Sequence, residues 1–69
     1  MRIYHLSQMG IKISRNTTNP DSSNWRVIHA LKQLGTATSD QIAMSAGLEE
    51  NEADMSLRLL QRKGIVEVS

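Results

Sequence analysis

The sequence predicts one small domain that is mainly α-helical and carries a short β-sheet. Its aromatic residues are Trp25 and Tyr4, and Phe is absent from the 69 positions. The core must therefore be built from Leu, Ile, Val, Ala and Met, which suits packed helices better than a β-sandwich. Three stretches with helical periodicity end at glycines, with short β-branched stretches between or after them. A domain this short buries only roughly 60% of its unfolded surface, so it must be compact or use the surface of a partner.

Several classes of function are disfavoured by what the sequence lacks. It has no cysteine, so neither a disulfide framework nor a thiolate zinc site can form. Its apolar runs are far shorter than a membrane span or the core of a signal peptide. His5 and His29 lie far apart, and no glycine-rich phosphate loop or nucleophile elbow is present. We therefore expect a soluble, cytoplasmic protein that is not an enzyme and uses no membrane, metal, cofactor or small-molecule substrate.

The charges are distributed unevenly along the chain. Residues 1–35 contain five cationic side chains and one acidic side chain, whereas residues 36–69 contain three cationic and six acidic side chains. Such an asymmetry is typical of a charged interaction surface, although two ordinary solvated faces would give the same counts. Charge alone leaves both interpretations open.

The N-terminal third predicts a small unit, residues 1–23, that packs on a core formed by residues 24–69. Residues 2–6 alternate enough for a short strand, and residues 8–14 have the pattern of a short helix. The run 15–24 has no apolar residue and contains a proline, so we expect a loop or linker there.

The first core helix is predicted over residues 25–34. A serine or asparagine at positions 22–24 can cap its start, and Gly35 lies where a residue of positive φ ends a helix. One broad buried stripe is expected from apolar residues spaced about three apart. These are Trp25, Val27, Ile28, Leu31 and Leu34.

A second helix is predicted from a capping box. Residues 36–38 form a short β-branched stretch, and Thr38 is followed three positions later by Gln41, so each side chain can bond to the backbone of the other residue. The helix should run through Ser45 and end at Gly47. Its expected core residues are Ile42, Ala43 and Ala46.

The third helix is predicted over residues 49–63. Ala53, Leu57 and Leu60 share one face and form its core stripe. After a closing glycine, residues 65–68 predict a strand.

The order and tight spacing of these elements resemble the winged helix-turn-helix regulators that are common in bacteria and archaea. The resemblance covers roughly residues 25–68. The matching residues are Ile28, Leu31, Gly35, Thr38, Ile42, Ala43, Gly47, Leu48, Ala53, Leu57, Leu60, Gly64, Ile65 and Val66. It implies a three-helix core with a two- or three-stranded sheet. It also implies that residues 49–63 form a recognition helix for the major groove of duplex DNA, in a transcriptional regulator that works as a homodimer or within a larger assembly.

The N-terminal segment suggests a truncated wing. Tyr4, Leu6, Ser7 and Gly10 resemble a Tyr-x-Leu-Thr-x-x-Gly segment that usually leaves the wing of such domains, yet here the segment precedes the core. We predict that residues 2–6 pair with residues 65–68, with residues 36–38 completing a three-stranded sheet. Pairing with a strand from another copy is the alternative.

The candidate DNA contacts are polar or exposed positions on the predicted recognition helix and near the starts of the other two helices. They are Arg26, Thr38, Ser39, Asn51, Met55, Arg58 and Arg62. Thr38 and Ser39 lie at a helix N-terminus, where backbone N–H groups favour phosphate. An opposing feature is the start of the recognition helix, because four carboxylates in six positions repel a polyanion. They are Glu49, Glu50, Glu52 and Asp54.

The second functional hypothesis is a protein-binding adaptor that does not bind DNA. Met55 and Leu59 lie four residues apart and off the core stripe of their helix. Either the N-terminal segment covers them as additional core, through Met9 and Ile13, or they form a protein-binding or dimer patch. In the second case the protein-binding surface would consist of Met55 and Leu59 together with the acidic residues Glu50 and Asp54 beside them.

Overall fold

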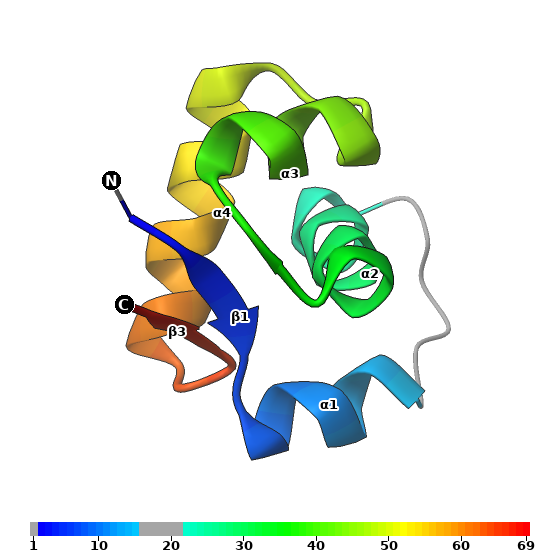
Figure 1. Ribbon diagram of the computed structural model, residues 1–69, viewed down its shortest axis with the longest axis vertical. Coiled ribbons are helices and arrows are strands. Elements are labelled where there is room, and N and C mark those ends of the chain that lie inside the picture. The colour runs from blue at the N-terminus through cyan, green and yellow to red at the C-terminus, as the bar shows by residue number, and fades with distance from the viewer. Residues whose placement is uncertain (1, 16–21) are drawn as a thin grey trace.

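The computed structural model describes residues 2–15 and 22–69, and these form a mainly α-helical, winged-helix-like fold with a small antiparallel sheet (Figure 1). The predicted fold class is therefore confirmed. The elements in chain order are β1 (Tyr4–Leu6), α1 (Gln8–Arg15), α2 (Ser23–Leu34), β2 (Thr36–Ala37), α3 (Ser39–Ala46), α4 (Glu50–Arg62) and β3 (Val66–Val68).

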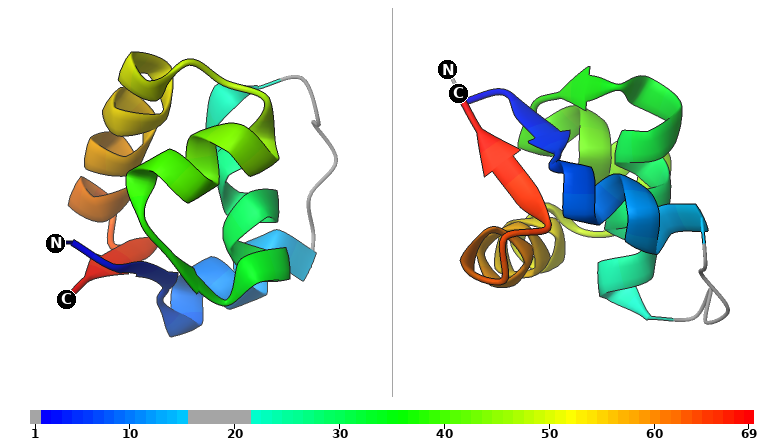
Figure 2. Two further views of the ribbon diagram at one scale, coloured as in Figure 1. Left: turned by 45° about the horizontal axis from the view of Figure 1, so that its top comes forward. Right: turned by 90° about the horizontal axis from the view of Figure 1, so that it is seen from below.

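The sheet joins segments from both ends of the chain in the order β2-β1-β3. In the antiparallel register, Tyr4 lies opposite Ala37 on one side and opposite Val68 on the other. The backbone N–H of Ser69 donates to the carbonyl of Ile3 at 2.9 Å, so the two ends of the chain lie side by side (Figures 1 and 2). The predicted pairing of three strands within one chain is confirmed. The two wing strands come from opposite ends of the sequence and are not joined by a hairpin loop.

Helix α1 is held against the turn that precedes β3. The Ser7 hydroxyl donates to the carbonyl of Gly64 at 2.6 Å, and the Ser7 N–H donates to the carbonyl of Ile65 at 2.9 Å. The same hydroxyl caps α1 by accepting from the N–H of Gly10 at 3.1 Å. A Cβ atom at Gly10 would overlap the carbonyl oxygen of Ile65, so glycine is what allows α1 to approach this turn so closely.

Helices α2, α3 and α4 pack on one another and on the sheet. Their buried side chains include the predicted core residues of α3 and α4, namely Ile42, Ala43, Ala53, Leu57 and Leu60. The predicted stripe on α2 is partly wrong, because Leu34 is 46% exposed and Ala30 is buried instead. A three-residue repeat drifts around a helix of 3.6 residues per turn, so over nine residues it moves about half a turn away from its starting face. Trp25, at the other end of the stripe, is half-buried against the core.

The corner between α3 and α4 is sharp. The predicted capping box is confirmed at the start of α3: the Thr38 hydroxyl accepts from the N–H of Gln41, and the Gln41 side chain accepts from the N–H of Thr38. At the other end, Gly47 adopts a left-handed conformation with φ of 69°, and α4 starts at Glu50. The chain therefore changes direction sharply between Ala46 and Glu50, and α4 lies along the side of the molecule (Figure 2).

Candidate nucleic-acid interface

The outer face of α4 is a continuous exposed stripe. Asn51, Met55, Arg58 and Arg62 follow one another at intervals of four, three and four residues, which places them within about 60° of one another around the helix. All four are exposed, and Met55 is 72% exposed. The buried side of α4 lies directly opposite. It consists of Ala53, Ser56, Leu57 and Leu60.

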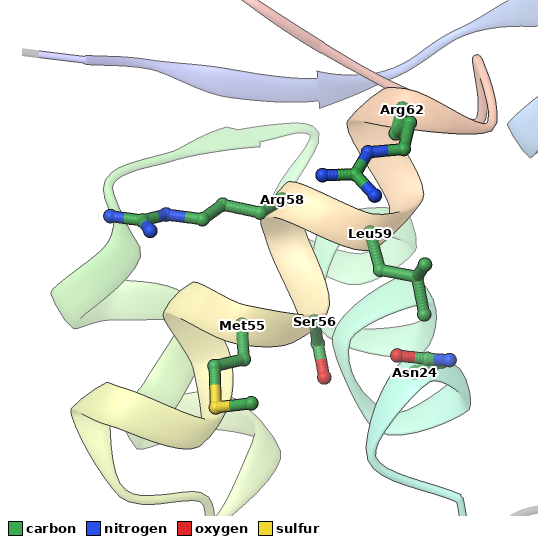
Figure 3. A pocket seen from close by; sticks show the side chains of 6 residues that line it. All are labelled: Asn24, Met55, Ser56, Arg58, Leu59 and Arg62. Carbon is green, nitrogen blue, oxygen red and sulfur yellow. The ribbon is translucent and has the colours of Figure 1, made fainter.

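A shallow hollow of about 520 Å³ extends from this stripe toward the start of α2. Figure 3 shows Leu59 and Asn24 pointing toward one another across it, while Arg58 extends away from them and the guanidinium group of Arg62 lies between Arg58 and Leu59. The lining residues are Asn24, Met55, Ser56, Arg58, Leu59 and Arg62. The hollow thus combines the apolar side chains of Met55 and Leu59 with two cationic groups and the polar side chains of Asn24 and Ser56.

Among the described residues, no carboxylate forms an ion pair with either guanidinium group on α4. Within residues 2–15 and 22–69 the ion pair that forms is the one between His5 and Glu67, at 3.7 Å on the sheet. Arg58 and Arg62 therefore present two unpaired positive charges one helical turn apart. An exposed pair of cations in this arrangement can contact phosphate oxygens or the acceptor edge of a guanine.

The carboxylates of α4 flank the stripe and do not fill it. Glu50 and Asp54 lie on the side of α4 nearer α3, and Glu52 lies on the opposite flank. A side-chain hydrogen bond with Asp40 raises the pKa of Glu50 above its ordinary value of 4.5, with further increases from the charge of Asp40, from desolvation and from the charge of Asp54. The expected repulsion of a polyanion is thus strongest at the α3 edge, and the centre of the stripe carries only cationic and neutral side chains.

The predicted DNA contacts lie in three separate places. Met55, Arg58 and Arg62 lie together around the hollow beside α4, and Asn51 continues their stripe. Arg26 is not part of this surface, because it lies two residues, or about 200° around α2, from Asn24, which faces α4.

The predicted phosphate contacts at the start of α3 lie elsewhere. Thr38 and Ser39 are half-buried and line a separate hollow of about 400 Å³ together with Arg2, Asp40 and Asp54. The Thr38 hydroxyl already accepts the N–H of Gln41 within the capping box. Two carboxylates in the same hollow counteract the attraction of this helix N-terminus for phosphate, so the structure does not bring these residues into the α4 site.

The acidic and apolar parts of the predicted protein-binding patch are also separate. Met55 and Leu59 line the hollow beside α2, whereas Glu50 lines another surface hollow with Met44 and Asp54 lines the one beside Arg2. A partner held by the first hollow would therefore meet Arg58 and Arg62, and neither Glu50 nor Asp54.

Of the two alternatives for Met55 and Leu59, the one in which the N-terminal segment covers them is wrong. Met55 is 72% and Leu59 is 38% exposed, and Met9 itself is 53% exposed. Helix α1 is anchored at the end of the molecule opposite the α3–α4 corner (Figure 1) and buries Gly10 and Ser14 against its neighbours. The apolar residues at positions 9 and 13 indicated an amphipathic helix, but the close contact at Gly10 determines which side of that helix is buried.

Sequence reasoning missed Asn24 and Ser56 as members of the site. Ser56 is 6% exposed and lies at the floor of the hollow, and Asn24 borders it from the first turn of α2. The sequence indicates Asn24 only as one of three possible caps of α2, and in the structure Ser22 takes that position. Their proximity to α4 depends on how α2 and α4 pack, which periodicity within either helix does not specify.

No family model matches this chain, and neither does any curated protein or solved structure. In the part of the chain that the structure describes, no three His, Asp or Glu side chains are grouped so that they could hold a metal ion. None of the helices described is both long and apolar enough to cross a membrane.

Proposed function

We propose that this chain is a winged-helix DNA-binding module of a transcriptional regulator, with α4 as the helix that enters the major groove of duplex DNA. The observation that carries the proposal is the exposed stripe on α4, which combines an amide, an apolar side chain and two unpaired guanidinium groups. Arginine pairs with guanine or phosphate, asparagine pairs with adenine, and an apolar side chain contacts the thymine methyl group. The sharp corner at Gly47 supports this role because it leaves the outer side of α4 free.

The arrangement of charge implies weak binding that depends on salt. If Arg58 and Arg62 each neutralise one phosphate, the logarithm of the binding constant falls with the logarithm of salt concentration with a slope of about −1.8. That slope corresponds to a loss of affinity of roughly 12-fold between about 50 and 200 mM salt. The carboxylates on either side of the stripe reduce the affinity further, which is consistent with a module that needs a second copy or additional contacts for tight binding.

The test is a titration of labelled duplex DNA at low and moderate salt. Arg58→Ala together with Arg62→Ala should abolish binding, because it removes both cations of the stripe. Lys12→Ala together with Lys32→Ala is the matched control, since it removes the same net charge from exposed positions on α1 and α2 and should leave most of the affinity. Unchanged binding by the first variant, or an equal loss in both, would remove α4 as the contact surface.

The second candidate function is a protein-binding adaptor that does not bind DNA, and the exposure of Met55 and Leu59 is the observation that favours it. In this case the hollow beside α4 holds an apolar side chain of a protein partner, and duplex DNA shows no affinity at either salt concentration. Replacing Met55 and Leu59 by Ser should then abolish partner capture while the domain stays folded. Measurable DNA binding that is lost with the two arginines would exclude this alternative.

A further inference from the structure

We infer that a second copy of this chain docks on α4, with the two α4 helices antiparallel about a two-fold axis. This inference goes beyond the proposed function, because it concerns the DNA-free protein. It rests on a second stripe of α4, adjacent to the first, whose members are Glu52, Met55, Leu59 and Arg62.

This stripe has the spacing of a helix–helix seam. Its residues follow at intervals of three, four and three, which is the pattern of the contact positions in a coiled coil. All four side chains are exposed, and the two in the middle are apolar. The two apolar side chains form a short seam that another helix can cover, and the charged side chains at its two ends can pair across the contact.

The stripe is complementary to itself in only one direction. In an antiparallel pair centred between Met55 and Leu59, each Met55 faces the partner's Leu59, and each Glu52 faces the partner's Arg62. Every contact occurs twice, as a two-fold axis requires. In a parallel pair Glu52 would face the partner's Glu52 and Arg62 the partner's Arg62, and both like-charge contacts are repulsive.

The described residues around the stripe leave its charges and the neighbouring hollow available to such a partner. Within the described ranges neither Glu52 nor Arg62 forms an ion pair, so both charges are available across the interface. The hollow between Leu59 and Asn24 lies directly beside the seam and can receive the partner's Met55 (Figure 3).

The expected dimer is weak and competes with DNA. Helix α4 has 13 residues and is therefore about 20 Å long, so one helix pair buries an area at the low end for specific interfaces. Met55 and Arg62 belong to both stripes of α4, so a copy engaged in the dimer cannot use its outer face for DNA. The dimer is then the DNA-free form, and DNA binding should dissociate it.

The test is sedimentation equilibrium of the full chain without DNA, from micromolar to millimolar concentration. The wild-type chain should pass from the mass of one chain to the mass of two. Glu52→Lys alone and Arg62→Glu alone should each weaken the dimer by about tenfold or more, because each converts both symmetry-related ion pairs into repulsions. The combination of both substitutions should restore dimerisation, because the exchanged charges again face opposite charges.

Two further variants make the result specific. Lys32→Glu, a charge reversal on α2, should leave dimerisation unchanged, and Met55→Ser with Leu59→Ser should abolish it. A chain that stays monomeric throughout, a dimer that ignores the reversals at positions 52 and 62, or a folded double reversal that does not recover would each overturn the inference. The measurement contains no DNA, so its outcome does not depend on whether the chain binds DNA. The variant with both Glu52→Lys and Arg62→Glu separates the two activities, because it should dimerise although it has lost an arginine of the proposed DNA contact.

Discussion

At the residue scale, Gly10 shows that a residue with low helix propensity can be the one that a helix needs. Replacing a solvent-exposed glycine inside a helix by alanine normally stabilises it by about 1 kcal/mol. Here the added methyl group would overlap the backbone carbonyl of Ile65, which cannot move aside without displacing β3 or α1. The sign of the effect is therefore reversed.

Gly10→Ala is accordingly expected to destabilise the protein by about 1–3 kcal/mol, the usual cost of overpacking a tight contact. Urea denaturation followed by circular dichroism measures this difference. Lys12→Ala, at an exposed position of the same helix, is the control and should change stability by no more than about 0.5 kcal/mol. A stabilised Gly10→Ala variant would show that α1 does not approach the turn before β3 as closely as described.

Glu50 is the residue whose ionisation reports the crowding of carboxylates at the α3–α4 corner. Its hydrogen bond with Asp40 and the charge of that group raise the pKa of Glu50 above 4.5. A carboxyl group with a raised pKa binds its proton more tightly in the folded than in the unfolded protein. Its contribution to stability is therefore fully present below pH 4.5 and is lost as the pH rises through the raised pKa of the folded state.

Asp40→Asn is expected to lower the pKa of Glu50 toward its ordinary value, because it removes the carboxylate that accepts the hydrogen bond of protonated Glu50 and also removes the neighbouring charge. An NMR titration of the Glu50 side-chain carboxyl carbon measures the shift. Glu52→Gln is the control, since Glu52 lies on the opposite flank of α4 and should leave the titration of Glu50 unchanged. An identical Glu50 titration in wild-type and Asp40→Asn protein would contradict the geometry of this corner.

At the element scale, local chemistry in the sequence specified where α3 and α4 begin and end. The capping box at Thr38 and the left-handed glycine at position 47 act within a few residues, so both could be predicted with their correct structural roles. The core stripe of α4 could also be predicted, because Ala53, Leu57 and Leu60 follow the helical period closely.

The sequence could not specify what covers the other faces of the helices. Periodicity identifies an apolar position such as Leu59 but does not say which element lies over it, and α1 packs elsewhere. The same limit explains why the sequence predicts Arg26 and not Asn24 as a member of the site. Which of these two side chains on α2 faces α4 depends on how the two helices pack. Arg58, Arg62 and Met55 could be predicted together because helical spacing alone places them on one face of α4.

Exposure of the α4 stripe gives a direct prediction for stability. Replacing both Met55 and Leu59 by Ser should lower the free energy of unfolding by no more than about 2 kcal/mol, because Met55 is 72% exposed and Leu59 is 38% exposed. Leu57→Ala on the same helix should cost about 2–5 kcal/mol, since Leu57 is fully buried. Chemical denaturation of the two variants measures the contrast. A large loss in the Met55 and Leu59 variant would mean that these residues belong to the core.

At the scale of the whole molecule, the sheet connects the two ends of the sequence. Strand β1 lies between β2 and β3, so the N-terminal segment supplies the central strand that the rest of the chain needs. The sheet therefore brings together three elements that are distant in sequence. It also leaves the outer side of α4 uncovered, which is the property on which both the DNA proposal and the dimer inference depend.

The most direct test of whether the uncovered side of α4 contacts DNA is an NMR titration with duplex DNA at low salt. The isotopically labelled protein is held at a concentration where it is monomeric. The proposed function predicts that the largest changes in backbone amide shifts cluster on α4 at Asn51, Met55, Arg58 and Arg62, and that these changes diminish as salt is added. Changes centred on α1, or no change at any residue, would contradict the assignment of α4 as the DNA-contacting helix.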